Sequence, residues 1–334
     1  MKMNNILKTT ALLLGSSVLL SGCIKETFPE SGYATSDQTA ESPFAKEGLI
    51  TAMPTVLITN YTDLGEHIDF GYPGIFGATD RMVGEVFPVS GNLPGGNQYY
   101  DRWQAWLYPG NSTGLAANGW ASPFFYTNYY KFIFTANEAI DIANQSEGAE
   151  EMMGIAKTFR ALCYLDLARL YDALPAKAPE RPAYETELEA VKGLTVPIVR
   201  EDTSMEELEN NPRVSREEMF KFIFEDLNTA ETLLANYTPA TKNLPSLAVI
   251  YGLKARAYLW LGGFDSSKYA DAATYARKAI DASKCTIMTE AEWLNPKTGF
   301  NKANNSWMWY LPQSTEGIAN LVNFAAWRSS EATW

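Results

Sequence analysis

Apolar residues recur at helical spacing along most of the chain from residue 121 onward. The first stripe follows Ser122 and Pro123, a cap-then-proline pair of the kind that starts helices. Its apolar positions are Phe125, Tyr129, Phe132, Ile133, Ala136, Ile140 and Ala143. A second stripe, over about 148–171, contains Ile155, Phe159, Leu162, Tyr164, Leu167, Leu170 and Tyr171. The two stripes predict a pair of amphipathic helices across residues 121–172.

Two further helical pairs are predicted after residue 214. Ser215 is followed three residues later by Glu218, the pattern of a capping box that starts a helix. The apolar face of that helix is predicted to contain Phe220, Ile223, Leu227, Ala230, Leu233 and Leu234. Its partner spans about 246–261, with Leu253, Ala257 and Leu261, so the second pair covers 215–262. The third pair covers 265–283 onward and carries Ala272, Tyr275, Ala276, Ala279 and Ile280.

The sequence around residue 260 has the spacing of a tetratricopeptide repeat. Tyr258, Gly262 and Phe264 match the aromatic residue, the tight turn and the second-helix aromatic of that repeat. Ala272 and Ala279 supply small residues seven apart, which allow close helix packing. Unrelated antiparallel helices would share the amphipathic pattern but not this spacing. The predicted fold class is mostly α, with tetratricopeptide-like helical pairs and an additional loop-rich region.

The part of the chain before residue 121 carries fewer helical signals. Residues 24–45 are rich in Ser, Thr, Glu, Pro and Gly, which is typical of a flexible tether. Glycine and proline punctuate residues 46–120, so we expect one helix at about 46–65 and loops after it. The expected organisation is a lipoprotein signal peptide at 1–22, a flexible tether at 23–45 and a single α-helical domain at 46–334.

A short apolar run precedes the tether and ends at a cysteine. Residues 11–20 are too few for a helix of about 20 apolar residues that would cross a bilayer, and they fit a secretory signal peptide. Leu20, Ser21, Gly22 and Cys23 resemble a bacterial lipobox, in which the cysteine becomes the lipidated first residue. The alternative is an ordinary signal peptide with a cysteine by chance. We expect Cys23 to be a lipid attachment site that anchors the chain to a membrane.

Composition excludes several partners and sites. The formal net charge is −12, and it becomes −14 without residues 1–22, which hold two lysines and no acidic residue. Binding of nucleic acid needs clustered Lys and Arg, so nucleic acid is excluded as a partner. Besides Cys23 the cysteines are Cys163 and Cys285, for which a disulfide and two free thiols are both open. We expect no metal site and no cofactor, because no Cys-x-x-Cys or Cys/His cluster occurs.

Several short motifs occur in order along the helical region. In residues 156–171, Arg160 is followed by an alanine, then by Asp166, and then by the run Arg169-Leu170-Tyr171. The other segments are Thr79–Met82, Tyr100–Trp103, Trp120–Asn137, Leu194–Val199 (a strand-like valine-proline segment), Val214–Leu227 and Ala255–Gly262. With these motifs the chain from Cys23 to about Tyr310 resembles the SusD/RagB family of Bacteroidetes outer-membrane nutrient-binding lipoproteins.

The resemblance implies a SusD-like fold and a binding protein without catalytic activity. It implies a place at the cell outer membrane, exposed at the surface and held by the lipid on Cys23. The implied partners are a glycan or oligosaccharide and a SusC-like TonB-dependent transporter, on which the protein would sit as a lid. Family members usually continue beyond this length with a loop-rich region, so the carboxy-terminal part is expected to be missing.

Aromatic residues are concentrated between residues 99 and 134, where 13 of 36 positions are aromatic against 13% of the whole chain. Those at helical spacing are interpreted mostly as core: Phe125, Tyr129, Tyr130, Phe132 and Phe134. Those in loops have no helix face to explain them. Sugars bind through apolar C–H faces stacked on aromatic rings, with hydrogen bonds from Asp, Asn and Arg at the rim, so loop tryptophans beside such residues predict a glycan site.

The predicted glycan-binding residues come from two parts of the chain. The first part supplies Arg81, Asp101, Trp103, Trp106 and Trp120. The family resemblance adds Trp307, Trp309 and Trp327 from loops after the helical pairs. The alternative for each tryptophan is that it packs a loop onto the helices.

An enzyme is not predicted. His67 is the only histidine, which excludes His-dependent catalytic triads and His metal sites, and no nucleophile elbow, P-loop or Gly-x-Gly-x-x-Gly occurs. Two carboxylates suffice for a glycosidase, but nothing singles out a pair among 39 acidic residues. The prediction is a lipid-anchored protein that captures a glycan for import. The alternative is a membrane-tethered tetratricopeptide scaffold that binds a protein or peptide.

Overall fold

The structure is a computed structural model of the chain, and it describes residues 41–58, 72, 121–172, 189–297 and 303–311. The signal peptide, residues 23–40 of the expected tether with Cys23, and residues 59–65 of the first expected helix lie outside these residues. The end of the expected tether is wrong, since residues 43–45 form the first turn of a helix that runs from Pro43 to Ile58. The helices of the described part are α3 (Pro43–Ile58), α5 (Ala121–Asn144), α6 (Glu150–Tyr171), α8 (Met205–Glu209), α9 (Arg216–Leu233), α10 (Leu247–Gly262), α11 (Lys268–Ser283) and α12 (Glu290–Trp293).

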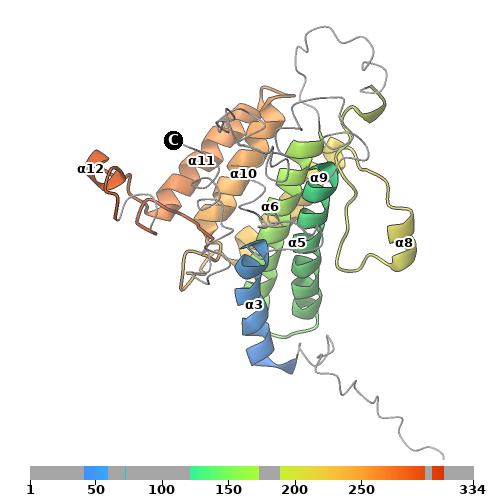
Figure 1. Cartoon of the computed structure of the whole chain (residues 1–334), viewed down its shortest axis with the longest axis horizontal. Helices are drawn as coiled ribbons and strands as arrows, with labels where there is room; N and C mark the ends of the chain where they lie inside the picture. The colour runs from blue at the N-terminus through green and yellow to red at the C-terminus, as the bar shows by residue number, and fades with distance from the viewer. Residues whose placement is uncertain (1–40, 59–71, 73–120, 173–188, 298–302, 312–334) are drawn as a thin grey trace, which may run out of the picture.

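The helices form a stack in which α6 is central. It packs against α5 on one side and α9 on the other, and α3 contacts both α5 and α6. Figure 1 shows α5 and α6 side by side, and α10 beside α11. The contact of α10 with α11 is more extensive than its contact with α9. The prediction of a mostly helical fold built from paired helices is confirmed.

Local sequence signals explain where several helices begin. The predicted capping box of α9 is present, since the Glu218 amide donates to Ser215 Oγ at 3.2 Å and the Ser215 amide donates to Glu218 Oε2 at 3.0 Å. Ser204 and Thr289 cap α8 and α12 in the same way. Each box satisfies backbone N–H groups that the first turn of a helix leaves without a partner.

The core lies where α5, α6 and α9 meet. All seven apolar positions predicted for the first stripe are buried on α5. α6 is buried around most of its circumference, because it has neighbours on both sides. Cys163 lies within this core as a free thiol, and Cys285 is a free, half-buried thiol, so the structure contains no disulfide between them.

α10 and α11 pack through small residues. Ala272 and Ala279 are buried, and a Cβ built on Gly262 would lie 2.3 Å from the Tyr269 ring, so only glycine fits this approach without a shift. Ala276 and Ile280, which belong to the same predicted helical pair, are both exposed, Ile280 by 54%. α11 packs mainly against α10, and one neighbour buries only one edge of a helix.

The segment after the long insertion runs in extended conformation rather than as a strand. Leu194 forms an isolated antiparallel bridge with Ser215, and the Thr195 amide donates to the Val214 carbonyl at 2.9 Å. The Val214 amide also donates to the Val196 carbonyl at 3.4 Å, and beyond it side chains hold residues 197–199 on the helices. Among the described residues, none of the helices is long and apolar enough to cross a bilayer.

Candidate functional site

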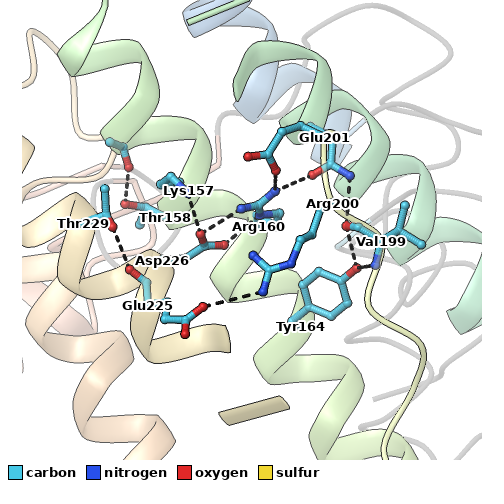
Figure 2. A network of polar contacts seen from close by, with 12 residues as sticks. Lys157, Thr158, Arg160, Tyr164, Val199, Arg200, Glu201, Glu225, Asp226 and Thr229 are labelled. Atoms are coloured by element: carbon cyan, nitrogen blue, oxygen red, sulfur yellow. Dashed lines mark hydrogen bonds and ion pairs between the residues drawn. The ribbon is translucent and has the colours of Figure 1, made fainter. Parts of the chain in front are cut away.

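A buried ion-pair network joins α5, α6, α9 and the extended segment (Figure 2). Arg160 has no exposed side-chain surface and binds Asp226 through two hydrogen bonds, from Nε to Oδ2 at 2.7 Å and from Nη2 to Oδ1 at 2.8 Å. Its Nη1 donates to Asn137 Oδ1 at 2.8 Å and to Glu201 Oε2 at 2.5 Å. Lys157 adds an ion pair to Asp226 at 3.0 Å. The guanidinium therefore connects four elements of the fold.

The electrostatics of this network favour its charged form. Burial opposes the charge on Arg160, but hydrogen bonds and attraction from Asp226 and Glu201 outweigh it and raise the pKa of the guanidinium. Burial likewise opposes ionisation of Glu201, and Arg160 outweighs that effect, so the pKa of Glu201 is lowered. Both groups stay ionised at neutral pH. The network can hold the fold together, but Arg160 has no surface left for a ligand.

The extended segment 196–201 is bound to α5 and α6 by side chains that contact its backbone. The Tyr164 hydroxyl donates to the Val199 carbonyl at 3.1 Å and accepts from the Val199 amide at 2.7 Å (Figure 2). Asn137 Nδ2 donates to the same carbonyl at 3.1 Å, and the Tyr130 hydroxyl donates to the Pro197 carbonyl at 2.5 Å. These contacts replace the missing ladder and fix the segment on the helices.

A second network surrounds Asp166 on α6. Arg256 of α10 donates to Asp166 Oδ1 at 2.7 Å, and the Tyr72 hydroxyl donates to Oδ2. Arg169 reaches Oδ1 at 3.3 Å from one turn along α6, and the Tyr129 hydroxyl lies 3.4 Å from Oδ2. Burial and the neighbouring Asp166 carboxylate raise the pKa of the Tyr72 hydroxyl, so it stays a neutral hydrogen-bond donor.

The motif residues that carry the family resemblance therefore have structural contacts. Asn137, Arg160 and Asp226 belong to the first network, while Asp166 and Arg169 belong to the second. Within the described ranges, no group of three or more His, Cys, Asp or Glu could hold a metal ion. Aromatic side chains that are exposed or only half-buried form a different kind of surface on the described part of the chain.

One such surface is the aromatic pair Trp307 and Tyr310, on the segment after α12. Their ring centroids lie 5.8 Å apart with the rings inclined at 56°, and both side chains are half-buried. The segment is tied to the loop before α10, because Lys242 Nζ donates to the Trp307 carbonyl at 2.7 Å and the Tyr310 amide donates to the Lys242 carbonyl at 3.1 Å. The backbone that carries the pair is thus held in place on the helical stack.

Trp309 has a different environment from Trp307. Its ring meets Phe159 of α6 edge to face at 5.2 Å, and its Nε1 donates to the Asn243 carbonyl at 2.9 Å. It packs against the main core. Of the two tryptophans predicted here from sequence, Trp309 anchors the segment. Trp307 lies beside Tyr310, whose ring is also half-buried.

The remaining predicted site residues cannot be placed. Arg81, Asp101, Trp103, Trp106, Trp120 and Trp327 lie outside the described residues, as do Cys23 and His67. Their assignment to glycan binding or to the lipid anchor stays a prediction. Sequence reasoning did not include Tyr310 in the site, although an aromatic residue three positions after Trp307 was a usable signal.

A second exposed aromatic surface lies on α5. Tyr126 and Phe134 are exposed by 38% and 64%, and Tyr130 between them is half-buried. The expectation that Tyr130 and Phe134 are mostly core is wrong for Phe134 and holds only in part for Tyr130. Phe125, Tyr129 and Phe132 fill the core side of the same helix, so the next aromatic stripe around its circumference faces outward.

Comparison with known proteins gives one family. A model of a SusD-like family, described as "Starch-binding associating with outer membrane", matches residues 96–259. This range covers α5, α6, α9 and most of α10. No curated protein matches the sequence.

Solved structures share the fold at low sequence identity. A SusD-like carbohydrate binding protein from Bacteroides vulgatus ATCC 8482 is similar with a TM-score of 0.59 and 21% identity, covering 79% of this chain and 49% of that one. B. fragilis NanU has a TM-score of 0.56 and 16% identity over 85% and 51%. A SusD homolog from Bacteroides thetaiotaomicron VPI-5482 has a TM-score of 0.55 and 14% identity over 85% and 50%. The chain spans about half the length of these proteins.

Proposed function

Because this chain belongs to the SusD-like family, we propose that it is a lipid-anchored protein of the cell surface that captures a glycan or oligosaccharide. The captured sugar would pass to a SusC-like TonB-dependent transporter for import. Family membership supports binding without catalysis and a location at the outer membrane. One of the similar structures is that of a carbohydrate binding protein, which supports the class of ligand.

The Trp307–Tyr310 pair is the observation in this chain that carries the proposal. Ligand sites combine apolar and aromatic surface with a few fixed polar groups, and an inclined aromatic pair offers the apolar surface that the C–H face of a sugar needs. Lys242 binds the backbone of the segment and the Asn243 carbonyl accepts from the Trp309 side chain, so the segment that carries the rings is held in place before the ligand arrives. Arrangement in advance reduces the entropy lost on binding.

Affinity electrophoresis tests glycan capture directly. The chain without its signal peptide is run through native gels that contain soluble starch, a plant hemicellulose or mucin glycans. We expect at least one polysaccharide to retard the wild type and Trp307→Ala to weaken that binding about three- to tenfold, the loss of one aromatic contact. Trp293→Ala, which removes another tryptophan exposed by 54%, is the matched control and should bind as the wild type does.

The same gels judge the loop tryptophans that the sequence predicts. If Trp103→Ala, Trp106→Ala and Trp307→Ala all bind like the wild type, the aromatic platform is wrong. If glycan binding is absent and variants on the helices abolish capture of a protein partner, the tetratricopeptide scaffold is the better function.

The anchor and the transporter need separate tests. In cells, Cys23→Ala should prevent labelling by a radioactive fatty acid and should release the chain from the membrane fraction. Purification of the tagged wild type from detergent-solubilised outer membranes should bring down a large TonB-dependent receptor. Recovery of the wild type without such a receptor would contradict the transporter partnership but leave glycan binding intact.

A further inference from the structure

The outward side of α5 carries three aromatic residues in a row, Tyr126, Tyr130 and Phe134, spaced four residues apart. Residues at this spacing lie one above the other on a helix, so the row is about 12 Å long at 1.5 Å rise per residue. We call it the α5 aromatic row. Phe134 is the most exposed member, with 64% of its surface accessible, and its exposed apolar ring is not explained by the core, which α5 contacts with its other side.

The α5 aromatic row lines an open depression of about 530 Å³. This volume is in the range of pockets that hold small ligands, roughly 300–1,000 Å³. The lining side chains are the three aromatic residues together with Thr127, Lys131 and Thr135. No aliphatic side chain is among them, which distinguishes the depression from the grooves that accept apolar helices of partner proteins.

Neighbouring contacts hold the rings of the row in place. Tyr126 and Tyr130 lie 4.3 Å apart between ring centroids, and Tyr126 meets Tyr171 of α6 edge to face at 6.2 Å. The Tyr130 hydroxyl is bound to the Pro197 carbonyl of the extended segment. The first two rings are therefore fixed before any ligand binds, while Phe134 continues the row toward solvent.

We propose that the α5 aromatic row is a second glycan-binding surface, which takes an extended stretch of the captured oligosaccharide. The C–H faces of successive sugar units would stack along the rings, and hydroxyl and ammonium groups from the lining would hydrogen-bond the sugar hydroxyls. This inference rests on the proposed function and adds a surface to it that is built on α5, separate from the segment that carries Trp307 and Tyr310.

The test uses the polysaccharide that retards the wild type most in the affinity gels. Phe134→Ala is the informative variant, because an exposed side chain can be truncated with little effect on folding. Its matched control is Leu259→Ala on α10, where the leucine is exposed by 59%. We expect Phe134→Ala to weaken binding about three- to tenfold, Phe134→Tyr to restore it, and Leu259→Ala to bind like the wild type. All variants should melt at the same temperature.

Several results would overturn this inference, and they differ from those that would overturn the proposed function. If the wild type is retarded and Phe134→Ala is retarded equally, the second surface is wrong while glycan capture stands. If Leu259→Ala weakens binding as much as Phe134→Ala, the effect is not specific to the row. If Phe134→Ala keeps glycan binding but loses the transporter in pull-down, the row is a protein-docking surface. A wild type that no polysaccharide retards overturns both proposals.

Discussion

α6 and α11 are helices of the same stack, yet 15 of the 22 residues of α6 are buried and only two of the 16 residues of α11 are. α6 lies between α5 and α9, whereas α11 packs mainly against α10. The buried residues of α6 include Arg160 and Asp166, while those of α11 are both alanines. One helix is constrained on every side, and the other along a single edge.

The difference explains where the family signal of this chain lies. A buried charge needs specific partners at specific distances, so replacing Arg160 leaves the half-buried Glu201 without its ion-pair partner and the buried Asp226 with Lys157 alone. A buried alanine requires only that nothing larger takes its place. The motif residues of α6 therefore report the framework of the fold, and the proposed ligand surfaces lie elsewhere, on the Trp307–Tyr310 pair and the α5 aromatic row.

The largest expected effect contrasts two arginines. Arg160→Ala should destabilise the protein by about 3–5 kcal/mol, because it removes the ion-pair partner described for Glu201 and the bidentate partner of the buried Asp226, which keeps only Lys157. Arg277→Ala on α11 removes an exposed side chain and should change stability by less than about 0.5 kcal/mol. Urea denaturation of both variants measures the contrast. An equal loss of stability in the two variants would contradict the conclusion that α6 is packed on every side and α11 along one edge only.

The next effect contrasts two glycines. A Cβ on Gly154 of α6 would lie 2.7 Å from Cγ of the fully buried Leu234, and a Cβ on Gly262 of α10 would lie 2.3 Å from the ring of Tyr269. Leu234 has nowhere to move, so Gly154→Ala should cost about 1–3 kcal/mol. Tyr269 is exposed by 47% and can swing into solvent, so Gly262→Ala should cost less than about 1 kcal/mol.

Thermal unfolding of the two glycine variants decides the comparison. The variant Gly262→Ala combined with Tyr269→Ala serves as the control, since removal of the ring should restore the stability lost to the added methyl group. If Gly262→Ala lowers the stability more than Gly154→Ala does, α10 and α11 are packed as rigidly as the centre of the stack.

The smallest expected effect on stability is that of Glu201, and it depends on pH. The pKa of Glu201 is lowered in the folded protein, so its contribution to stability is present above its ordinary pKa of about 4.3 and is lost as the pH falls through the lowered value. Glu201→Gln should therefore be less stable than the wild type at pH 7, and the difference should narrow below about pH 4. Urea midpoints measured from pH 7 to pH 3 test this.

A second carboxylate provides the control for the pH series. Glu225 is exposed by 49% and pairs with Arg200 at 3.6 Å, at the edge of the same network. Glu225→Gln should follow the wild type at every pH, because an exposed pair adds little stability. A constant difference between Glu201→Gln and the wild type down to pH 3 would show that the carboxylate acts by shape rather than by charge.

Sequence patterns that span only one or two helical turns predicted the local structure correctly. Ser215 and Glu218 cap α9 as their spacing indicates, because the atoms that bond are three residues apart along the chain. The apolar stripe of α5 from Phe125 to Ala143 is buried throughout, because its period matches the geometry of a helix. Helix existence and one core face followed from such patterns alone.

Periodicity failed where a helix offered more than one apolar stripe. On α5, the stripes that begin at Phe125 and at Tyr126 have the same helical period, and only contact with α6 selects the first for the core. On α11, Ile280 continues an apolar pattern, but it is exposed because α10 covers only the edge with Ala272 and Ala279. The same limit separates Trp307 from Trp309, which differ in their neighbours and not in their type.

The sequence by itself determined the helical class, the caps and the family motifs, because these depend on spacing along one helix. The tertiary structure decided what the motif charges do, since Asn137, Glu201 and Asp226 come from three segments and meet at Arg160 only after α5, α6 and α9 have packed. It also decided which aromatic rings are buried in the core and which stay exposed. Burial depends on neighbours that are distant in sequence, and no local pattern contains them.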